Sequence, residues 1–324
     1  MAGLPIQGRP TPDEARGILT STPKAGLPHA GLFRLAPAVF LLLWSTGFTV
    51  AKVGLAHAPP LTFLALRYAL VVASLLPALA VVRPPLPRGA RAWRDLALVG
   101  LLVQFGYFAL NWGALAAGSG IGVAALAASL QPVLVALLAP LAGGPRVGGR
   151  AWLGLALGVA GAAAVIAARS GLARPTALGV ALSVASVACM AVGTLWEKRA
   201  AGSGAHPLAA AFVQYLVGLA GSAAVAALFE TMRVQWTADF VWALLYLVVA
   251  NSLVAISLLL AMVRRGDAAR VSTLFFLVPP AAAVMDWAVT GTRLPLPAWG
   301  GMALAALGVL LATRRGDARR AGRS

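Results

Sequence analysis

The sequence contains one cysteine, three histidines and nine acidic residues among its 324 residues. The single cysteine, Cys189, excludes a disulfide within the chain and any metal site that needs several cysteines. The histidines lie far apart in the sequence and do not show the spacing of metal ligands. We therefore predict no metal and no cofactor.

Motifs that mark common enzyme sites are also missing from the sequence. It has no glycine-rich phosphate loop ending in Gly-Lys-Ser/Thr, which nucleotide hydrolysis by that route requires. It has neither the His-Glu-x-x-His helix of zinc proteases nor the Gly-x-Ser-x-Gly elbow of hydrolases. Its few carboxylates do not cluster. These absences indicate a protein that is not an enzyme.

Apolar residues dominate the sequence. They make up 60% of the chain, charged residues make up 11%, and the mean hydropathy is +0.86. Soluble domains typically carry about 25% charged residues, so this composition predicts an integral membrane protein in a lipid bilayer. The formal charge of +17 lies in short gaps between apolar runs, which argues against a nucleic-acid partner.

Ten apolar runs are long enough to cross about 30 Å of hydrocarbon as helices. We predict an all-α integral membrane protein with ten transmembrane helices, near residues 35–56, 61–82, 95–117, 119–141, 151–168, 176–197, 207–229, 239–263, 271–290 and 296–313. Residues 1–34 are polar and proline-containing, which predicts a disordered tail, and residues 314–324 form a basic tail.

The chain repeats itself at an offset of 147 residues, since Arg67-Tyr68 recurs as Gln214-Tyr215. The same offset relates Pro60 and Pro207, Pro132 and Pro279, Arg146 and Arg293, Trp152 and Trp299, Gly154 and Gly301, and Gly161 and Gly308. The sequence therefore predicts two five-helix repeats, residues 35–168 and 176–313. An odd number of spans inverts the second repeat, and secondary transporters place their sites between such halves.

Basic residues between the spans predict the orientation. Twenty lie on the side that holds both termini, and four, Arg169, Arg174, Arg233 and Arg293, lie on the other. By the positive-inside rule, both termini are then cytoplasmic.

Three ionisable residues lie well within the apolar runs: Lys52, Arg67 and Asp286. Inserting a charge into a bilayer costs roughly 2.5–3.5 kcal/mol, so such residues indicate a functional site. We place all three in a predicted substrate site, where Asp286 couples protons or holds a cationic substrate. The alternative is structural, with Lys52 and Arg67 snorkelling outward and Asp286 pairing with one of them. Glu197 and Lys198 are expected at the cytoplasmic end of span six.

Uncharged polar and aromatic residues complete the predicted site. Gln104, Phe108 and Asn111 have helical spacing, so we expect them on one face of span three. Trp44 and Asn251 are further predicted lining residues, and Trp44 offers a ring on which a substrate can stack. The competing interpretations are interhelical hydrogen bonds, at ~0.6 kcal/mol each, and interface anchoring of the tryptophan.

Proline and glycine add two expectations about helix shape and packing. Pro132 and Pro279 fall inside spans four and nine, where they are predicted to break the helix and shape the cavity, or only to bend the chain. Spans five and ten carry the small-x-x-x-small pattern at Gly154 and Gly158, and at Gly301 and Ala305. These spans either pack within the chain or form a homodimer face.

Several motifs occur in a characteristic order. Trp44 is followed by Lys52, then come Pro60 and Arg67, Leu130-Gln131-Pro132, Leu277-Val278-Pro279, and the Trp-Leu-Gly and Trp-Gly-Gly starts of spans five and ten. Over about residues 35–313 this order resembles the EamA-type transporters of the drug/metabolite transporter superfamily. The resemblance implies a ten-helix bundle with a central cavity that exports amino acids or related metabolites across a bacterial inner membrane.

The sequence departs from that family's pattern after spans four and nine. A Gly-Glu-Arg-Leu-like turn is usual there, and this chain has Gly144-Pro145-Arg146-Val147 and Gly291-Thr292-Arg293-Leu294. Any role of the missing glutamates therefore does not carry over.

We expect a secondary transporter or facilitator that moves a small metabolite outward by alternating access. Two alternatives stay open, a flippase for a lipid-linked polar headgroup and a membrane sensor or scaffold that transports nothing. A cavity that opens sideways to lipid would favour the flippase, and an absence of solute counterflow would favour the scaffold.

Overall fold

The computed structural model describes residues 35–144, 147–169, 176–265, 271–281, 284 and 295–313, and all regular elements in these ranges are helices. Eight of them are long and apolar enough to cross a membrane, and Leu296–Ala312 is a shorter apolar helix. Span nine is described only from residue 271 to 281 and at residue 284. The prediction of an all-α membrane fold is confirmed. The predicted tails and Asp286 lie outside the described residues.

Five spans make up the first repeat. They are α2 (Ala36–Leu55); α3 (Pro60–Val82); α4 (Gly89–Val99) continued by the π-helix η2 (Gly100–Tyr107) and α5 (Phe108–Ala116); α6 (Gly120–Ser129) with α7 (Gln131–Leu138) and the short η3 (Ala139–Ala142); and α8 (Gly149–Arg169).

The second repeat reproduces this order. It consists of α9 (Ala177–Ala200) with the short η4 (Ala201–Ser203); α10 (Pro207–Phe229); α11 (Ala238–Tyr246) continued by the π-helix η5 (Leu247–Ile256) and α12 (Ser257–Arg265); η6 (Thr273–Leu277) within span nine; and α15 (Leu296–Thr313). The helices α3 and α10, η2 and η5, and α8 and α15 begin 147 residues apart, at positions 60 and 207, 100 and 247, and 149 and 296. Because each repeat has five spans, the second is inverted relative to the first.

Local sequence signals explain where several helices begin. Pro60 and Pro207 occupy the first turns of α3 and α10, where a missing backbone N–H costs nothing. The Thr176 side chain accepts a hydrogen bond from the Gly179 N–H and caps α9. The start of α3 is also held by the second repeat, because the Glu230 carboxylate accepts hydrogen bonds from the N–H groups of Leu61 (2.9 Å) and Thr62 (2.7 Å).

Both repeats contain a π-helix at the same place, and the neighbouring helix binds each one through a tyrosine. The Tyr68 hydroxyl on α3 donates to the carbonyl of Gln104 in η2 (2.5 Å). The Tyr215 hydroxyl on α10, 147 residues later, donates to the carbonyl of Ser252 in η5 (2.7 Å). Each carbonyl thus has a bonding partner outside its own helix. Wider π turns of this kind are frequent at functional sites.

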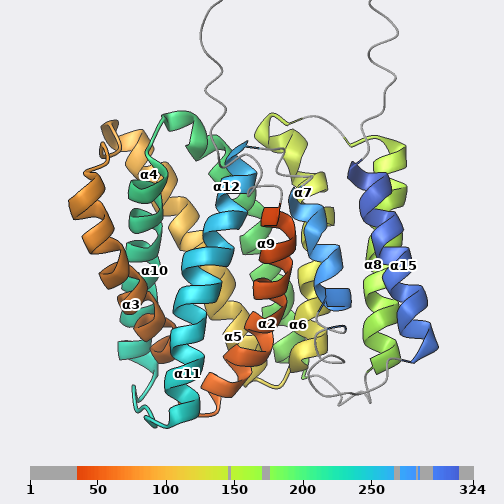
Figure 1. Ribbon diagram of the computed structural model, residues 1–324, viewed down its shortest axis with the longest axis horizontal. Helices are drawn as coiled ribbons and strands as arrows, with labels where there is room; N and C mark the ends of the chain where they lie inside the picture. The colour runs from red at the N-terminus through yellow and green to blue at the C-terminus, as the bar shows by residue number, and fades with distance from the viewer. Residues whose placement is uncertain are drawn as a thin grey trace, which may run out of the picture. The chain divides into compact units, whose positions relative to one another are not determined.

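The last helices of the two repeats, α8 and α15, lie side by side (Figure 1). Glycines let their backbones touch, since a Cβ atom added at Gly154 would lie 2.7 Å from the Gly308 carbonyl oxygen. At Gly301 an added Cβ would lie 2.9 Å from the Gly161 carbonyl oxygen. The small-residue pattern of these spans is therefore used within the chain.

We expect Gly308→Ala to destabilise the fold by about 1–3 kcal/mol, as overpacking of a tight contact does. The added methyl group would lie 2.7 Å from the Gly154 carbonyl oxygen, a backbone atom that cannot turn aside. Gly300→Ala on the same helix is the matched control, because nothing lies within 4 Å of its added Cβ. Thermal unfolding in detergent measures both, and equal midpoints for the two variants would contradict the packing.

Candidate functional site

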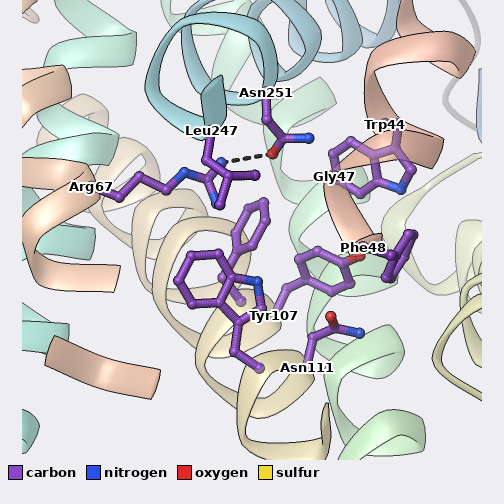
Figure 2. Close-up of a pocket in the computed structure, with 10 residues that line it drawn as sticks. Trp44, Gly47, Phe48, Arg67, Tyr107, Asn111, Leu247 and Asn251 are labelled. Atoms are coloured by element: carbon purple, nitrogen blue, oxygen red, sulfur yellow. Dashed lines mark hydrogen bonds between the residues drawn. The ribbon is translucent and has the colours of Figure 1, made fainter. Parts of the chain in front are cut away.

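Arg67 on α3 is fully buried. Its Nε donates a hydrogen bond to Ser252 Oγ (2.7 Å) and its Nη2 donates to Asn251 Oδ1 (2.8 Å). Figure 2 shows the second of these bonds crossing to the π-helix η5. An arginine of the first repeat is therefore held by the second repeat, which places this side chain at the boundary between the halves.

Aromatic rings surround the rest of the guanidinium group. Its central carbon lies 4.4 Å from the ring centre of Phe108 and 5.5 Å from those of Trp112 and Tyr68. Such cation–π contacts stabilise a desolvated cation. No carboxylate among the described residues contacts it, so its charge is balanced only by neutral dipoles and ring faces. A buried charge without a counter-charge is costly, which makes Arg67 a candidate site residue.

A small cavity lies beside Arg67. Its volume is ≈ 20 Å³, room for about one water molecule. The residues around it come from α2, α3, the third span and η5, namely Trp44, Gly47, Phe48, Arg67, Tyr107, Phe108, Asn111, Trp112, Leu247 and Asn251 (Figure 2). Residues of both repeats therefore line the same cavity.

Three hydrogen-bond donors of the lining residues are buried and have no partner within the described part of the chain. They are Arg67 Nη1, Trp44 Nε1 and Asn111 Nδ2. Leaving a buried donor unsatisfied typically costs about 1–3 kcal/mol. A ligand that supplies several acceptor oxygens would remove this cost, and a carboxylate is such a ligand.

Trp44 forms one wall of the cavity. Its ring stacks on Tyr107, with centres 5.8 Å apart, and meets Phe275 edge-on at 5.3 Å. One turn further along α2, Gly47 leaves room for Asn251, since a Cβ at this position would lie 2.6 Å from Asn251 Nδ2. The absent side chain thus lets the amide that binds Arg67 approach α2.

The structure brings together four of the predicted site residues, Trp44, Arg67, Asn111 and Asn251. Lys52 is exposed and does not line this cavity. Asp286 lies outside the described residues, so its predicted pairing and its role in coupling stay predictions.

Gln104 turns away from this cavity toward α10. Its Cβ lies 2.7 Å from the position that a Cβ on Gly218 would occupy. Gln104 lies in the π-helix η2, whereas Asn111 lies in the α-helix that follows, and of the three residues predicted to share a face only Phe108 and Asn111 line the cavity. The predicted common face assumed α-helical spacing, and a π-helix has more residues per turn than an α-helix.

The two prolines lie in matching breaks. Span four is interrupted at Leu130, just before Pro132, and span nine is a 3-10 helix up to Leu277, just before Pro279. The residues immediately before the prolines bind the first helix of the other repeat. Gln131 Nε2 donates to Thr194 Oγ1 on α9 (3.2 Å), and the Val278 carbonyl accepts from Ser45 Oγ on α2 (3.3 Å).

A second polar cluster occupies the equivalent place in the inverted repeat. Gln214, the counterpart of Arg67, donates through Nε2 to Glu197 Oε2 (2.7 Å), and the other Glu197 oxygen pairs with Arg264 Nε. Glu197 lies in the last turn of α9 and is fully buried there. α9 extends to Ala200, and packing against α12 covers the carboxylate. A cavity of ≈ 420 Å³ adjoins these three side chains and His206.

Comparison with known proteins identifies the two repeats. Residues 35–167 and 177–314 each match the EamA-like transporter family. The chain belongs to this family. A domain of the EamA-like type thus occurs twice, as the internal offset predicts, and the predicted resemblance is confirmed.

Curated relatives of this EamA-like protein are transporters by name. It is 27% identical over 288 residues to an uncharacterized transporter, YvbV, of Bacillus subtilis (strain 168), covering 88% of this chain and 92% of the relative. It is also 27% identical, over 272 and 268 residues, to proteins of Escherichia coli (strain K12) and Salmonella typhimurium (strain LT2) named as probable amino-acid metabolite efflux pumps. Each comparison covers 78% of this chain and 87% of the relative.

One solved crystal structure shares the fold of this EamA-like chain. It superposes with a TM-score of 0.70 over 86% of this chain and 96% of its own length, at 22% sequence identity. The family and the relatives together identify a multi-pass membrane protein that transports small molecules, and they point away from an enzyme.

Proposed function

We propose that this EamA-like protein exports an amino acid or a related carboxylate metabolite, with Arg67 binding the carboxylate. The buried guanidinium group carries the proposal, because it has no acidic partner among the described residues and an unused Nη1 donor beside the cavity. Trp44 Nε1 and Asn111 Nδ2 supply further donors, and Asn251 orients the arginine. An arginine fork suits the two oxygens of a carboxylate.

The rest of the cavity suits the remainder of an amino acid. The faces of Phe108, Tyr107 and Trp44 offer apolar contact to a side chain and cation–π contact to an ammonium group. Two relatives are named as probable amino-acid metabolite efflux pumps, which supports the same substrate class here.

The small size of the cavity supports alternating access between the repeats. A volume of ≈ 20 Å³ holds about one water molecule and no amino acid, so the helices around Arg67 must separate to admit substrate. The contacts that must break are between repeats, including Arg67 to Asn251 and Ser45 to Val278. Inverted repeats allow one half to rock against the other around a fixed site. With both termini cytoplasmic in a bacterial inner membrane, Arg67 faces the outer half of the bilayer.

Counterflow in liposomes that contain the purified protein tests the proposal. Radiolabelled amino acids, offered one at a time against an excess of the same unlabelled compound inside, should enter faster than into protein-free liposomes for at least one compound. The methyl ester of that amino acid should not exchange, because it lacks the carboxylate that Arg67 binds. Equal exchange of the ester would refute the role of Arg67. Folded protein that exchanges no amino acid would favour the scaffold.

A further inference from the structure

The ends of α3, α4 and α9 that face the predicted cytoplasm carry a cluster of exposed arginines. Four of these arginines, Arg88, Arg91, Arg94 and Arg199, line a basin of ≈ 630 Å³. The other lining residues are Ala92, Asp95, Trp196 and Gly202. Asp95 is the acid that the structure places in the lining, and it is paired with Arg94 (3.0 Å). The basin therefore holds a surplus of positive charge.

Other observations show that this charge is not balanced by the described part of the protein. Arg88 and Arg91 form no ion pair with any described residue. Arg199 lies over the Trp196 ring, 4.9 Å from its centre, and so has a cation–π partner but no carboxylate partner among the described residues. Trp196 Nε1 is buried without a hydrogen-bond partner among the described residues. The basin thus offers positively charged donors to a group rich in acceptor oxygens.

An apolar groove shares the lining residue Arg94 with the basin. Its volume is ≈ 690 Å³, and it runs between α3, α4 and α10, lined by Leu79, Arg83, Pro84, Leu86, Trp93, Arg94, Ala97, Ala209, Phe212, Val213, Leu216 and Val217. Arg94 belongs to both spaces, which therefore adjoin. Arg83 and Arg94 are the charged residues of the groove, and the rest of its lining is uncharged.

We propose that an anionic phospholipid binds here, with its phosphate in the arginine basin and an acyl chain in the groove. A charged head joined to a long apolar chain is the chemistry that matches a cationic space next to an apolar one. Basic pockets at the cytoplasmic ends of transmembrane helices select anionic lipids over zwitterionic ones. This inference rests on the orientation in the proposed function, which puts the arginines at the cytoplasmic leaflet.

Binding of dioleoyl-phosphatidylglycerol to the purified full-length protein tests the proposal, with dioleoyl-phosphatidylcholine as the zwitterionic comparison. Native mass spectrometry from detergent should show retained phosphatidylglycerol, and thermal unfolding should show a stabilisation that phosphatidylcholine does not give. The triple variant Arg88→Ala/Arg91→Ala/Arg199→Ala should bind phosphatidylglycerol at least 10-fold more weakly, since each cation near a headgroup contributes roughly 5-fold. It leaves the Arg94–Asp95 pair in place.

Arg150→Ala is the matched control, because Arg150 is an exposed arginine at the start of α8 on the same predicted side. It should bind the lipid as the wild type does. Glycerol 3-phosphate, which has the charge but no acyl chain, should not displace the lipid. Equal binding of the two lipids, an unchanged triple variant, or full displacement by glycerol 3-phosphate would overturn the proposal. The lipid-binding assay does not depend on transport. The lipid proposal can therefore fail while the counterflow assay supports the proposed function, and the proposed function can fail while the lipid binds.

Discussion

Arg67→Gln is expected to abolish amino-acid counterflow while the protein still folds. The variant removes the guanidinium group that Asn251 and Ser252 hold against the cavity. Losing one partner of a buried, hydrogen-bonded charge pair costs about 2–5 kcal/mol, which corresponds to a loss of affinity of roughly 30-fold or more. Glutamine is the residue that the second repeat carries at the equivalent position, Gln214, where it is fully buried in a helix of the same kind.

The stability of this variant separates a functional arginine from a structural one. Wild-type Arg67 is fully buried without a carboxylate partner in the described ranges, so replacing it by a neutral side chain should leave the unfolding midpoint unchanged or raise it. Arg67→Lys keeps the charge but loses the planar fork, and it should also transport poorly. The measurements are counterflow of the amino acid that the wild type exchanges, and thermal unfolding in detergent.

Arg150→Gln, on the exposed start of α8, is the control for loss of one positive charge. A folded Arg67→Gln protein with normal counterflow would rule out carboxylate binding by this residue. A collapse in folded protein, with normal flux by what remains, would assign Arg67 a structural role.

The second large effect is expected at the Glu197–Arg264 ion pair. Arg264→Met should destabilise the protein by about 3–5 kcal/mol, because it leaves the fully buried Glu197 carboxylate without its counter-charge. Glu197→Gln should cost less than this, since Gln214 Nε2 can still donate to the remaining amide oxygen. The double variant Glu197→Gln/Arg264→Met should recover most of the loss, because it leaves no buried charge.

Reversible unfolding in mixed micelles with dodecyl sulfate measures the three free energies and closes a double-mutant cycle. The control pair is Arg94 with Asp95, in which the Arg94 side chain is 61% exposed against 14% for Arg264. Arg94→Met should therefore cost no more than about 1 kcal/mol. The prediction would be contradicted if Arg264→Met and Arg94→Met lowered the free energy of unfolding equally. It would also be contradicted if the losses at Glu197 and Arg264 were additive in the double variant.

Membrane insertion and duplication could both be predicted from the sequence. A long apolar run is stable in hydrocarbon as a helix, which satisfies its own backbone, so the helical type of the elements could be predicted from hydropathy alone. The offset of 147 residues predicted the repeats, and an odd number of spans predicted their inversion. Arg67 and Asn251 could be selected as site residues because polar side chains are rare inside spans and need partners there.

Only the tertiary structure decided how those side chains pair. Gln104 lies in the π-helix η2 and its Cβ lies against Gly218 of α10, and the sequence pattern predicted neither the π turn nor this neighbour. Tyr68 and Tyr215 bind carbonyls in those turns from neighbouring helices, a contact between residues 36 or 37 positions apart. Glu197 lies near the end of α9 but is fully buried, and it pairs with Arg264, which lies 67 residues further along the chain. Hydropathy and periodicity report each helix separately, whereas burial and ion pairing depend on which helices become neighbours.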